Sequence, residues 1–423
     1  YPDASRIFEE IDRLGIASAG VSNLLSAMAD FDFYRAAPPG GYKKGLPAHK
    51  RTDVGEGDIA PEMLGADFFP YRPSWLMRSP QRATLARATN LVQRTLASGE
   101  YAGGIWLEGS PSVEESTYWF SLLIDTTVPL VGNSAQRPHG TVSNDGDHNI
   151  IDSVDYICSR VWADEEGRDR VGVVVAQEKQ IFASREVQKG DARPGGYVAT
   201  GGHGGIIGRT GEDFPGHPTT LTFIPNRRHT YTSEVRLTQL PNTVDGVRKM
   251  DDGIGLVAVQ IKDASGDLLP TAIPKVAIIK GGGQYTGDAP LGEGERDLET
   301  EVGIRAAIDQ ALCDAPLAGF VGEGMSPYGM LNEAADAMLR RAVFSGQPVV
   351  KVGRGNNEGF AYHTPPFIAG GNLTASKARL LLMACLMKYG SPPPAANPDK
   401  PTSSEMAATS AVLQNYQAVF DTH

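Results

Sequence analysis

Cysteine is scarce in this sequence. The 423 residues contain only Cys158, Cys313 and Cys385, which lie far apart and form no C-x-x-C pair. This excludes a disulfide framework. So few thiols suit a reducing compartment, and a cytoplasmic location is therefore slightly favoured, with a periplasmic protein of few disulfides as the alternative.

Long apolar runs and an excess of basic residues are also absent. No stretch approaches the roughly 20 apolar residues that a membrane span needs, and the longest, near Leu380–Met387, has the length of a core helix. Lys and Arg number 39 against 50 Asp and Glu, which gives a formal net charge of −11. Because an acidic surface repels phosphate backbones and anionic lipids, we expect neither a nucleic-acid nor a membrane partner.

Motifs that hold metals or cofactors are missing as well. The eight histidines show no HExxH spacing, and the chain has neither a G-x-S-x-G elbow nor a G-x-x-x-x-G-K phosphate loop. Asp145–Asn149 is similar to the start of a calcium loop, but Ile150 stands where that loop requires glycine. The sequence therefore predicts no metal and no cofactor.

Short β-branched segments alternate with amphipathic segments along the chain. The expected strands are Gly104–Leu107, Val128–Val131, Val171–Ala176, Lys275–Lys280, Gly319–Gly322 and Pro348–Val352. The expected helices are Val113–Ile124, Leu298–Leu312, Leu331–Phe344, Thr374–Tyr389 and Ser403–His423. This alternation favours an α/β fold with a mainly parallel sheet.

Changes in composition suggest three parts. The polar, turn-rich segment Lys262–Pro274 predicts a boundary between an N-terminal domain, residues 1–265, and a C-terminal domain, residues 272–390. Residues 391–423 combine a proline-rich linker with a terminal helix, which docks on its own subunit or on a neighbour. Because residue 1 is Tyr and not Met, we expect further sequence upstream of it.

The segment Leu107–Glu115 joins an expected strand to an expected helix. Ser110 or Ser112 can cap that helix, and Ser112 with Glu115 forms a capping-box pattern, which explains the segment without any function. The functional alternative is that this helix start offers a hydroxyl and free backbone N–H groups to a developing oxyanion. Lys189, ordinarily a solvated surface lysine, could accept a proton if it were buried beside a hydroxyl.

A glycine-rich stretch follows Lys189. Gly195–Gly208, GGYVATGGHGGIIG, is too irregular for a dinucleotide-binding fingerprint, because no strand-to-helix unit frames it. It predicts a mobile loop or a bulged connection between strands.

Several blocks, taken in order, resemble the bacterial-type L-asparaginase/glutaminase family. EGSPSVEES at Glu108–Ser116 is similar to the family's HGTDTMEET, and SREVQKG at Ser184–Gly190 is similar to its ARDVTKT. Val131–Val154 is similar to the family's VGAMRP followed by SADGPxNLYNAV, and Arg227–Thr230 is similar to its RKHT. Ile273–Val276 is similar to the family's LPKV, and Pro366–Leu386 is similar to its GFxAxGxLxPxKARxLLxLAL. The collinear match extends from Ser79 to Tyr389.

This resemblance implies a two-domain α/β subunit with a larger N-terminal domain, mainly parallel, and a smaller flavodoxin-like C-terminal domain. It also implies a homo-oligomer, a tetramer or a dimer, whose active sites are shared between subunits. Family members hydrolyse side-chain amides of small molecules through a threonine acyl-enzyme and use no metal. A second Thr, a Lys and an Asp form their proton relay.

The family's site residues can be carried over one by one. The second catalytic Thr falls on Ser110, which keeps the hydroxyl, and the relay Lys falls on Lys189. The Asp that grips the substrate's α-ammonium falls on Pro111, which has neither charge nor donor. The resemblance places the substrate-contacting Ser on Ser79 and a distant acidic residue from the neighbouring subunit on Glu358.

Two departures shape the expected substrate and nucleophile. Pro111 replaces the gripping Asp, and Gly324–Pro327, GMSP, replaces the Asn-containing loop, so the expected substrate lacks a free α-amino group. The family's first nucleophilic Thr has no counterpart. Either it lies upstream of Tyr1, or Ser110 is the nucleophile and Lys189 its base.

The sequence thus predicts an asparaginase-like amidohydrolase that cleaves a carbon–nitrogen bond. In this interpretation Ser110 and Lys189 are catalytic, while Ser79 and the backbone around Gly109 orient the substrate. One alternative is a non-catalytic binding or scaffold relative, consistent with the lost Asp and Asn loop. Another is an esterase or lactonase that uses the same site.

Overall fold

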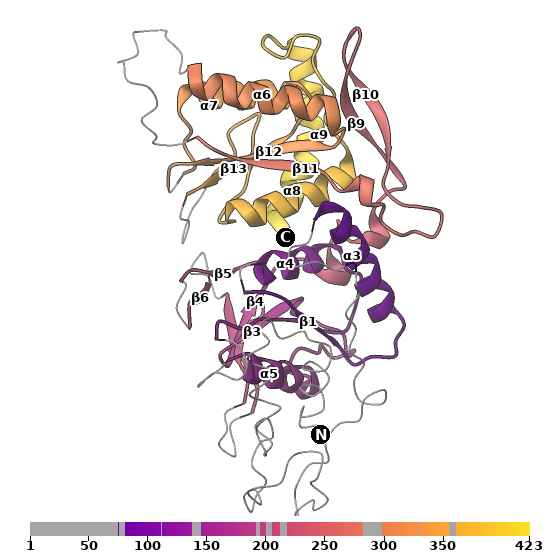
Figure 1. Ribbon diagram of the computed structural model, residues 1–423, viewed down its shortest axis with the longest axis vertical. Helices are drawn as coiled ribbons and strands as arrows, with labels where there is room; N and C mark the ends of the chain where they lie inside the picture. Colours follow the sequence, from indigo (N-terminus) through magenta and orange to yellow (C-terminus); the bar gives the residue numbers. More distant parts are fainter. Residues whose placement is uncertain are drawn as a thin grey trace, which may run out of the picture.

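The computed structural model describes residues 75, 81–110, 112–137, 145–191, 195–199, 205–211, 218–281, 298–326, 328–354 and 361–423. These residues form two lobes (Figure 1), each built around its own sheet. The N-terminal lobe contains a six-stranded sheet, and the C-terminal lobe contains a four-stranded one. Within the described residues, no helix is long and apolar enough to cross a membrane.

The N-terminal sheet is parallel in one half and antiparallel in the other. Its strand order is β1-β2-β3-β4-β7-β8. The bounds of these strands are Gly104–Leu107, Leu130–Asn133, Val174–Gln177, Gln180–Ala183, Ile206–Arg209 and Thr220–Leu221. β1, β2 and β3 pair in parallel, whereas a tight turn reverses the chain after β3 and makes the later pairings antiparallel. The mainly parallel character expected from the sequence therefore holds for the half that precedes the turn.

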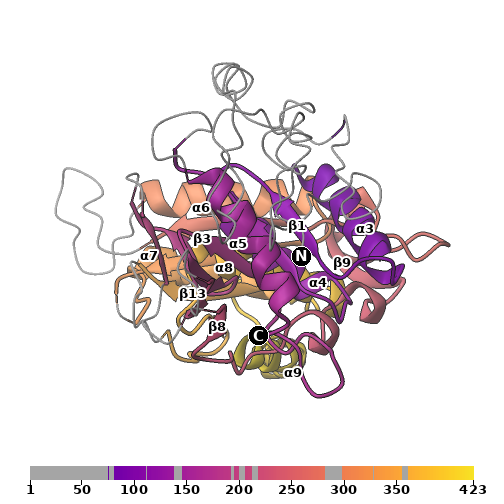
Figure 2. The same ribbon diagram turned by 90° about the horizontal axis from the view of Figure 1, so that it is seen from below.

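Three helices belong to this lobe: α3 (Arg82–Ala97), α4 (Val113–Leu123) and α5 (Gly146–Ser159). α4 lies between the sheet and the C-terminal lobe, and α5 lies on the other side of the sheet (Figures 1 and 2). This position explains why nine of the eleven residues of α4 are buried. α4 approaches β2 so closely that a Cβ built on Gly132 would lie 2.1 Å from Thr117 Cγ2.

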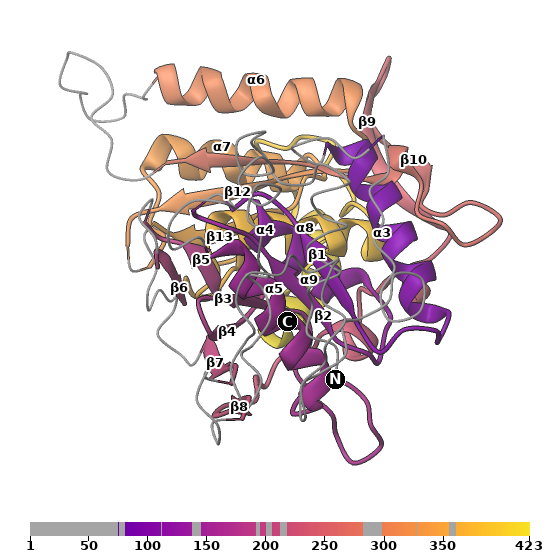
Figure 3. The ribbon, with the colours of Figure 1, turned by 60° about the horizontal axis from the view of Figure 1, so that its bottom comes forward.

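The C-terminal lobe has a parallel sheet between helices. Its strands are β11 (Lys275–Lys280), β12 (Ala318–Gly324), β13 (Val349–Gly353) and β14 (Ile368–Ala369), in that spatial order. α6 (Leu298–Asp314) and α7 (Glu333–Phe344) cover one face, and α8 (Ala375–Tyr389) covers the face toward the N-terminal lobe (Figures 1 and 3). α8 is buried along most of its length because both lobes enclose it.

Two hairpins and three short 3₁₀ helices complete the described chain. The hairpins are β5–β6 (Val187–Lys189 and Tyr197–Ala199) and β9–β10 (Thr243–Met250 and Gly253–Gln260). The 3₁₀ helices are η2 (Thr230–Thr232), η3 (Leu237–Gln239) and η4 (Pro270–Ala272). The sequence patterns predicted neither hairpin, and they predicted neither α3 nor α5.

The terminal helix α9 (Ser403–Thr422) docks on its own chain. A capping box of Thr402 and Glu405 starts it, and Tyr416 and Phe420 are buried where it packs against α8 and β14. His423 then reaches the N-terminal lobe, where its carbonyl oxygen accepts a hydrogen bond from Arg185 Nε at 2.7 Å. Of the two docking sites that the sequence left open, the structure shows the one within the chain.

Candidate active site

Ser110 lies in the turn between β1 and α4. Ser112 occupies the N-cap position of α4, but its side chain makes no capping hydrogen bond. The predicted capping box is therefore wrong. Glu115, its expected partner, instead binds Arg379 Nη2 of α8 at 2.5 Å. The start of α4 is consequently held by the C-terminal lobe and not by a local side-chain cap.

Lys189 ends strand β5, on the neighbouring hairpin, and its side chain reaches Ser110. Lys189 Nζ donates a hydrogen bond to Ser110 Oγ at 2.6 Å. Both residues are half-buried. Two residues 79 positions apart in the sequence thus bring an amine and a hydroxyl into direct contact.

Glu114, in the first turn of α4, connects the two segments that carry this pair. Its Oε2 accepts a hydrogen bond from the backbone N–H of Lys189. Burial raises the pKa of the Glu114 carboxyl, and the nearby Lys377 ammonium partly opposes that shift. Through Glu114, strand β5 is fixed to the same helix that begins after Ser110.

Tyr197 connects the two segments a second time. It stands opposite Lys189 in the β5–β6 hairpin, and its hydroxyl donates to the backbone oxygen of Ser110 at 2.5 Å. The same hydroxyl lies 2.9 Å from Ser134 Oγ, just after β2. Burial raises the pKa of Tyr197, so the hydroxyl keeps its proton for these contacts at neutral pH.

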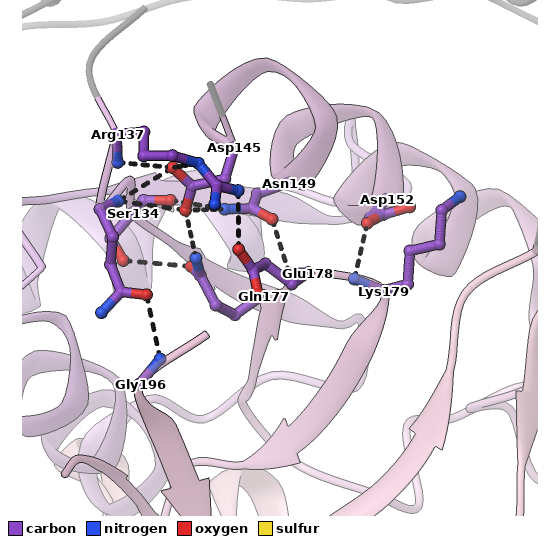
Figure 4. Close-up of polar contacts among 10 residues, drawn as sticks. Ser134, Arg137, Asp145, Asn149, Asp152, Gln177, Glu178, Lys179 and Gly196 are labelled. Carbon is purple, nitrogen blue, oxygen red and sulfur yellow. Dashed lines mark hydrogen bonds and ion pairs between the residues drawn. The ribbon is translucent and has the colours of Figure 1, made fainter. Parts of the chain in front are cut away.

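A polar network stabilises the loops beside Tyr197 (Figure 4). The buried Asp145 carboxylate accepts hydrogen bonds from the backbone N–H groups of Gln136 and Arg137 and from Gln177 Nε2. Gln136 Oε1 in turn accepts from the N–H of Gly196 at 3.3 Å. The Asp145 carboxylate is therefore engaged by the chain's own donors.

Lys377 of α8 extends from the C-terminal lobe into the space between these segments. Its Nζ donates to the carbonyl oxygens of Ser184, at 2.6 Å, and Glu114, and it lies 5.3 Å from the centre of the Tyr118 ring. The side chain is fully buried, and burial lowers its pKa to about 8, against the opposing charge of Glu114. One ammonium thus links α8 to α4 and to the turn that precedes Lys189.

Glu108 is a second half-buried acid near Ser110. Its Oε2 accepts a hydrogen bond from Trp106 Nε1 at 2.8 Å, while Oε1 has no hydrogen-bond partner among the described residues. Burial raises the pKa of this carboxyl. Glu108 and Glu114 therefore both have weakened acidity, and one oxygen of each already accepts a hydrogen bond from the protein.

The other residues expected at the site are only partly described. Gly109 is exposed, and its carbonyl oxygen accepts hydrogen bonds from the N–H groups of Ser112 and Val113 at 3.0 and 3.3 Å. Ser79, Pro111 and Glu358 lie outside the described residues. Over the described part of the chain, no group of three or more His, Cys, Asp or Glu residues is placed to hold a metal ion.

Sequence reasoning missed three residues that organise the pair. Glu114 and Lys377 stood inside the blocks that resemble the family, Glu108–Ser116 and Pro366–Leu386, but their contacts join segments that are 263 residues apart. Tyr197 stood in the glycine-rich stretch that predicted a mobile loop or a bulged connection between strands. The one available signal was the lone aromatic residue between glycines and β-branched residues, which is typical of a short strand.

Comparisons with known proteins agree with the resemblance of the sequence blocks. Residues 46–200 match the family described as asparaginase, N-terminal. The chain is 25% identical over 307 residues to a glutaminase-asparaginase from Acinetobacter glutaminasificans, covering 72% of this chain and 75% of that protein. It is 22% identical over 315 residues to L-asparaginase 2 from Bacillus subtilis, covering 73% and 67%.

A solved structure shares the fold. The structure of a probable cytoplasmic L-asparaginase from Campylobacter jejuni superposes with a TM-score of 0.55 at 18% sequence identity, and the match covers 81% of each chain. At this identity the likeness concerns the two-domain α/β fold. It confirms the fold class expected from the sequence.

Tyr197→Phe tests the second connection between the two segments. Removing the hydroxyl leaves the Ser110 carbonyl oxygen and Ser134 without this partner, so we expect the free energy of unfolding to fall by about 1–2 kcal/mol. Tyr328→Phe, at an exposed tyrosine, is the matched control and should change it by less than about 0.5 kcal/mol. Urea unfolding of the three proteins gives the comparison, and equal stability of all three would contradict the role of Tyr197.

Lys377→Met tests the buried ammonium through its pH dependence. An unfolded lysine has a pKa of about 10.4, whereas burial lowers the pKa of Lys377 to about 8. Between these values the unfolded chain binds more protons, so the free energy of unfolding of the wild type rises with pH. Relative to Lys377→Met, the wild type should gain up to about 1 kcal/mol per pH unit from pH 8 to pH 10. Lys280→Met, at an exposed lysine, is the control. The prediction would be contradicted if the difference in the free energy of unfolding between the wild type and Lys377→Met stayed constant over this pH range.

Proposed function

We propose, on the premise that this chain belongs to the asparaginase-like family, that it is an amidohydrolase acting on a small-molecule amide. The observation that carries the proposal is the 2.6 Å contact between Lys189 Nζ and Ser110 Oγ. A hydroxyl is a weak nucleophile until a neighbouring base takes its proton, and a lysine amine at hydrogen-bond distance is such a base. The family match and the curated relatives support a carbon–nitrogen bond as the target.

In the proposed reaction Ser110 is the nucleophile. Lys189, in its neutral form, takes the proton of Ser110 Oγ as that oxygen attacks the carbonyl carbon of the amide. The Lys189 ammonium then returns the proton to the departing nitrogen as the carbon–nitrogen bond breaks, and an ester remains on Ser110. Attack by water, with Lys189 again accepting and returning a proton, releases the acid and frees Ser110.

The pair is held without a local helix cap, and this supports its reactive role. In the first turn of α4, the N–H groups of Val113 and Glu115 bond to backbone oxygens, whereas the Glu114 N–H has no hydrogen-bond partner among the described residues and can serve a developing oxyanion. Glu114 and Tyr197 fix the backbone on both sides of the contact, at Lys189 N and at Ser110 O. A fixed geometry lowers the barrier because the reacting groups need not be ordered during the reaction.

The same proposal includes a substrate without a free α-amino group. A buried ammonium needs a carboxylate partner, and the residue after Ser110 is Pro111. The two half-buried acids near Ser110, Glu108 and Glu114, have raised pKa values, and each already accepts a hydrogen bond from the protein. A plain amide, a cyclic amide or an N-acylated compound meets these conditions.

Removal of either member of the pair tests the proposed chemistry. Lys189→Met and Ser110→Ala should each lower kcat/KM on an amide substrate by at least about 100-fold, because positioned acid–base catalysis contributes about 10²–10⁴-fold. Lys280→Met and Ser98→Ala, at exposed positions away from the pair, are the matched controls and should keep wild-type rates. Ammonia release from a panel of amides, with circular dichroism to confirm folding, provides the readout.

Three results of this experiment would contradict the proposal. Retained activity in Lys189→Met or Ser110→Ala would remove that residue from the mechanism. No turnover of any amide by the wild type would favour a non-catalytic binding protein. Turnover of esters or lactones without any amide hydrolysis would favour an esterase on the same site.

A matched pair of substrates tests the selectivity. Succinamic acid and L-asparagine carry the same side-chain amide and differ by the α-ammonium group. We expect kcat/KM to be at least about tenfold higher for succinamic acid, because Pro111 supplies no carboxylate for the ammonium and the pKa values of Glu108 and Glu114 are raised. Pro111→Asp should narrow the difference by supplying that carboxylate. A wild-type preference for L-asparagine would contradict this part of the proposal.

A further inference from the structure

One outer edge of the β9–β10 hairpin makes backbone hydrogen bonds to the rest of the chain, whereas the other edge makes none to the described residues. A turn at Asp251 and Asp252 joins the strands, and Met250 stands opposite Gly253. In such a two-residue hairpin, alternate residues of each strand bond to the partner strand and the residues between them direct N–H and C=O outward. On β10 the outward residues are Ile254, Leu256, Ala258 and Gln260.

Two outward backbone groups of β9 bond to the C-terminal lobe. Val247 N–H donates to Pro316 O at 2.8 Å, and Asp245 O accepts from Ser391 N–H at 2.7 Å. Both residues occupy the outward positions of β9 that this pattern predicts. On β10, the backbone groups of the four outward residues have no hydrogen-bond partner among the described residues.

β10 also lacks the features that normally keep an edge strand unpaired. Proteins protect such edges with proline, lysine or other charges, or with short strands. β10 has eight residues, GIGLVAVQ, with no charge and no proline. Leu256 is 44% exposed, and Met250 at the end of β9 is 39% exposed. The hairpin lies at the side of the C-terminal lobe (Figures 1 and 3).

We propose that β10 pairs with β10 of a second copy of this chain, antiparallel and about a twofold axis at Val257. The two hairpins then form a continuous four-stranded sheet. In this register Leu256 stands opposite Ala258 of the second copy, and Ile254 stands opposite Gln260. The arrangement is self-complementary, as a twofold interface requires, because each outward N–H and C=O meets its counterpart.

Charge selects this register. It places Asp252, exposed at the hairpin tip, opposite Lys262 of the second copy, just beyond the end of β10. Lys262 lies near Lys388, so the acidic tip of one copy approaches two lysines of the other. Arg236 and Glu234, the other charged neighbours of Lys388, have opposite signs. The basic residues near the tip, Arg248 and Lys249, belong to β9, the strand away from the shared edge. A slip by two residues separates Asp252 from Lys262.

A single strand edge of eight residues, about 27 Å long, covers less surface than the roughly 1,200–2,000 Å² of stable interfaces. We therefore expect a weak contact that depends on protein concentration. It is independent of the proposed catalytic activity, because β10 contributes no residue to the Ser110–Lys189 pair.

Substitutions at Ala258 test the pairing without disturbing the hairpin. Ala258→Pro removes an outward N–H and no bond to β9, whereas Ala258→Thr, the matched control, keeps the N–H and suits a strand. Sedimentation velocity should show that the mass doubles as the protein concentration increases. The starting mass is 45.1 kDa, or the mass of any assembly that forms through another surface. Ala258→Pro should raise the Kd of this step at least tenfold, and Ala258→Thr should leave it unchanged.

Charge reversal tests the register. Asp252→Lys should raise the same Kd about fivefold or more, and the double variant Asp252→Lys with Lys262→Asp should restore it. Melting temperatures of all variants show whether they remain folded. A chain whose mass does not change with concentration would overturn the proposal, as would an assembly that Ala258→Pro leaves unaffected. Loss of assembly in both Ala258 variants would also overturn it, because the N–H is then not the cause.

Discussion

The hydrogen bond between Lys189 Nζ and Ser110 Oγ is the interaction on which the account of this protein depends. It joins a turn after β1 to the end of β5, and neither segment could hold its side chain in place alone. Glu114 and Tyr197 tie the two backbones together, and Lys377 inserts an ammonium from the second lobe between them. The geometry of the pair therefore depends on both lobes. α4 lies at the junction of the lobes and is almost wholly buried there.

The chemistry of this junction follows from burial. The interior contains acids whose pKa values are raised and a lysine whose pKa is lowered, since each loses the hydration that favours its charged form. Hydrogen bonds to backbone groups compensate for much of this cost. The proposed selectivity against a substrate ammonium follows from this burial, because a buried ammonium needs a carboxylate partner.

The sequence predicted the parts of the structure that depend on local periodicity. Strands Gly104–Leu107 and Lys275–Lys280 have the expected bounds, and α4 begins at the expected Val113. The pairing of Ser110 with Lys189 was foreseen only through resemblance to a family, since nothing local joins residues 79 positions apart. The capping box failed because Arg379 competes for Glu115, and Tyr197 was missed because cross-strand pairing turned an apparent glycine-rich loop into a hairpin. In each case a long-range contact overrode the local pattern.

Acyl-enzyme trapping tests the central claim most directly. The protein is mixed with an amide or activated ester whose acyl group leaves slowly, quenched in acid and digested, and the modified residue is located by mass spectrometry. The account predicts one acyl group, on Ser110, and none in Lys189→Met under the same conditions. An adduct on a hydroxyl elsewhere in the chain, or equal labelling of Lys189→Met, would contradict it.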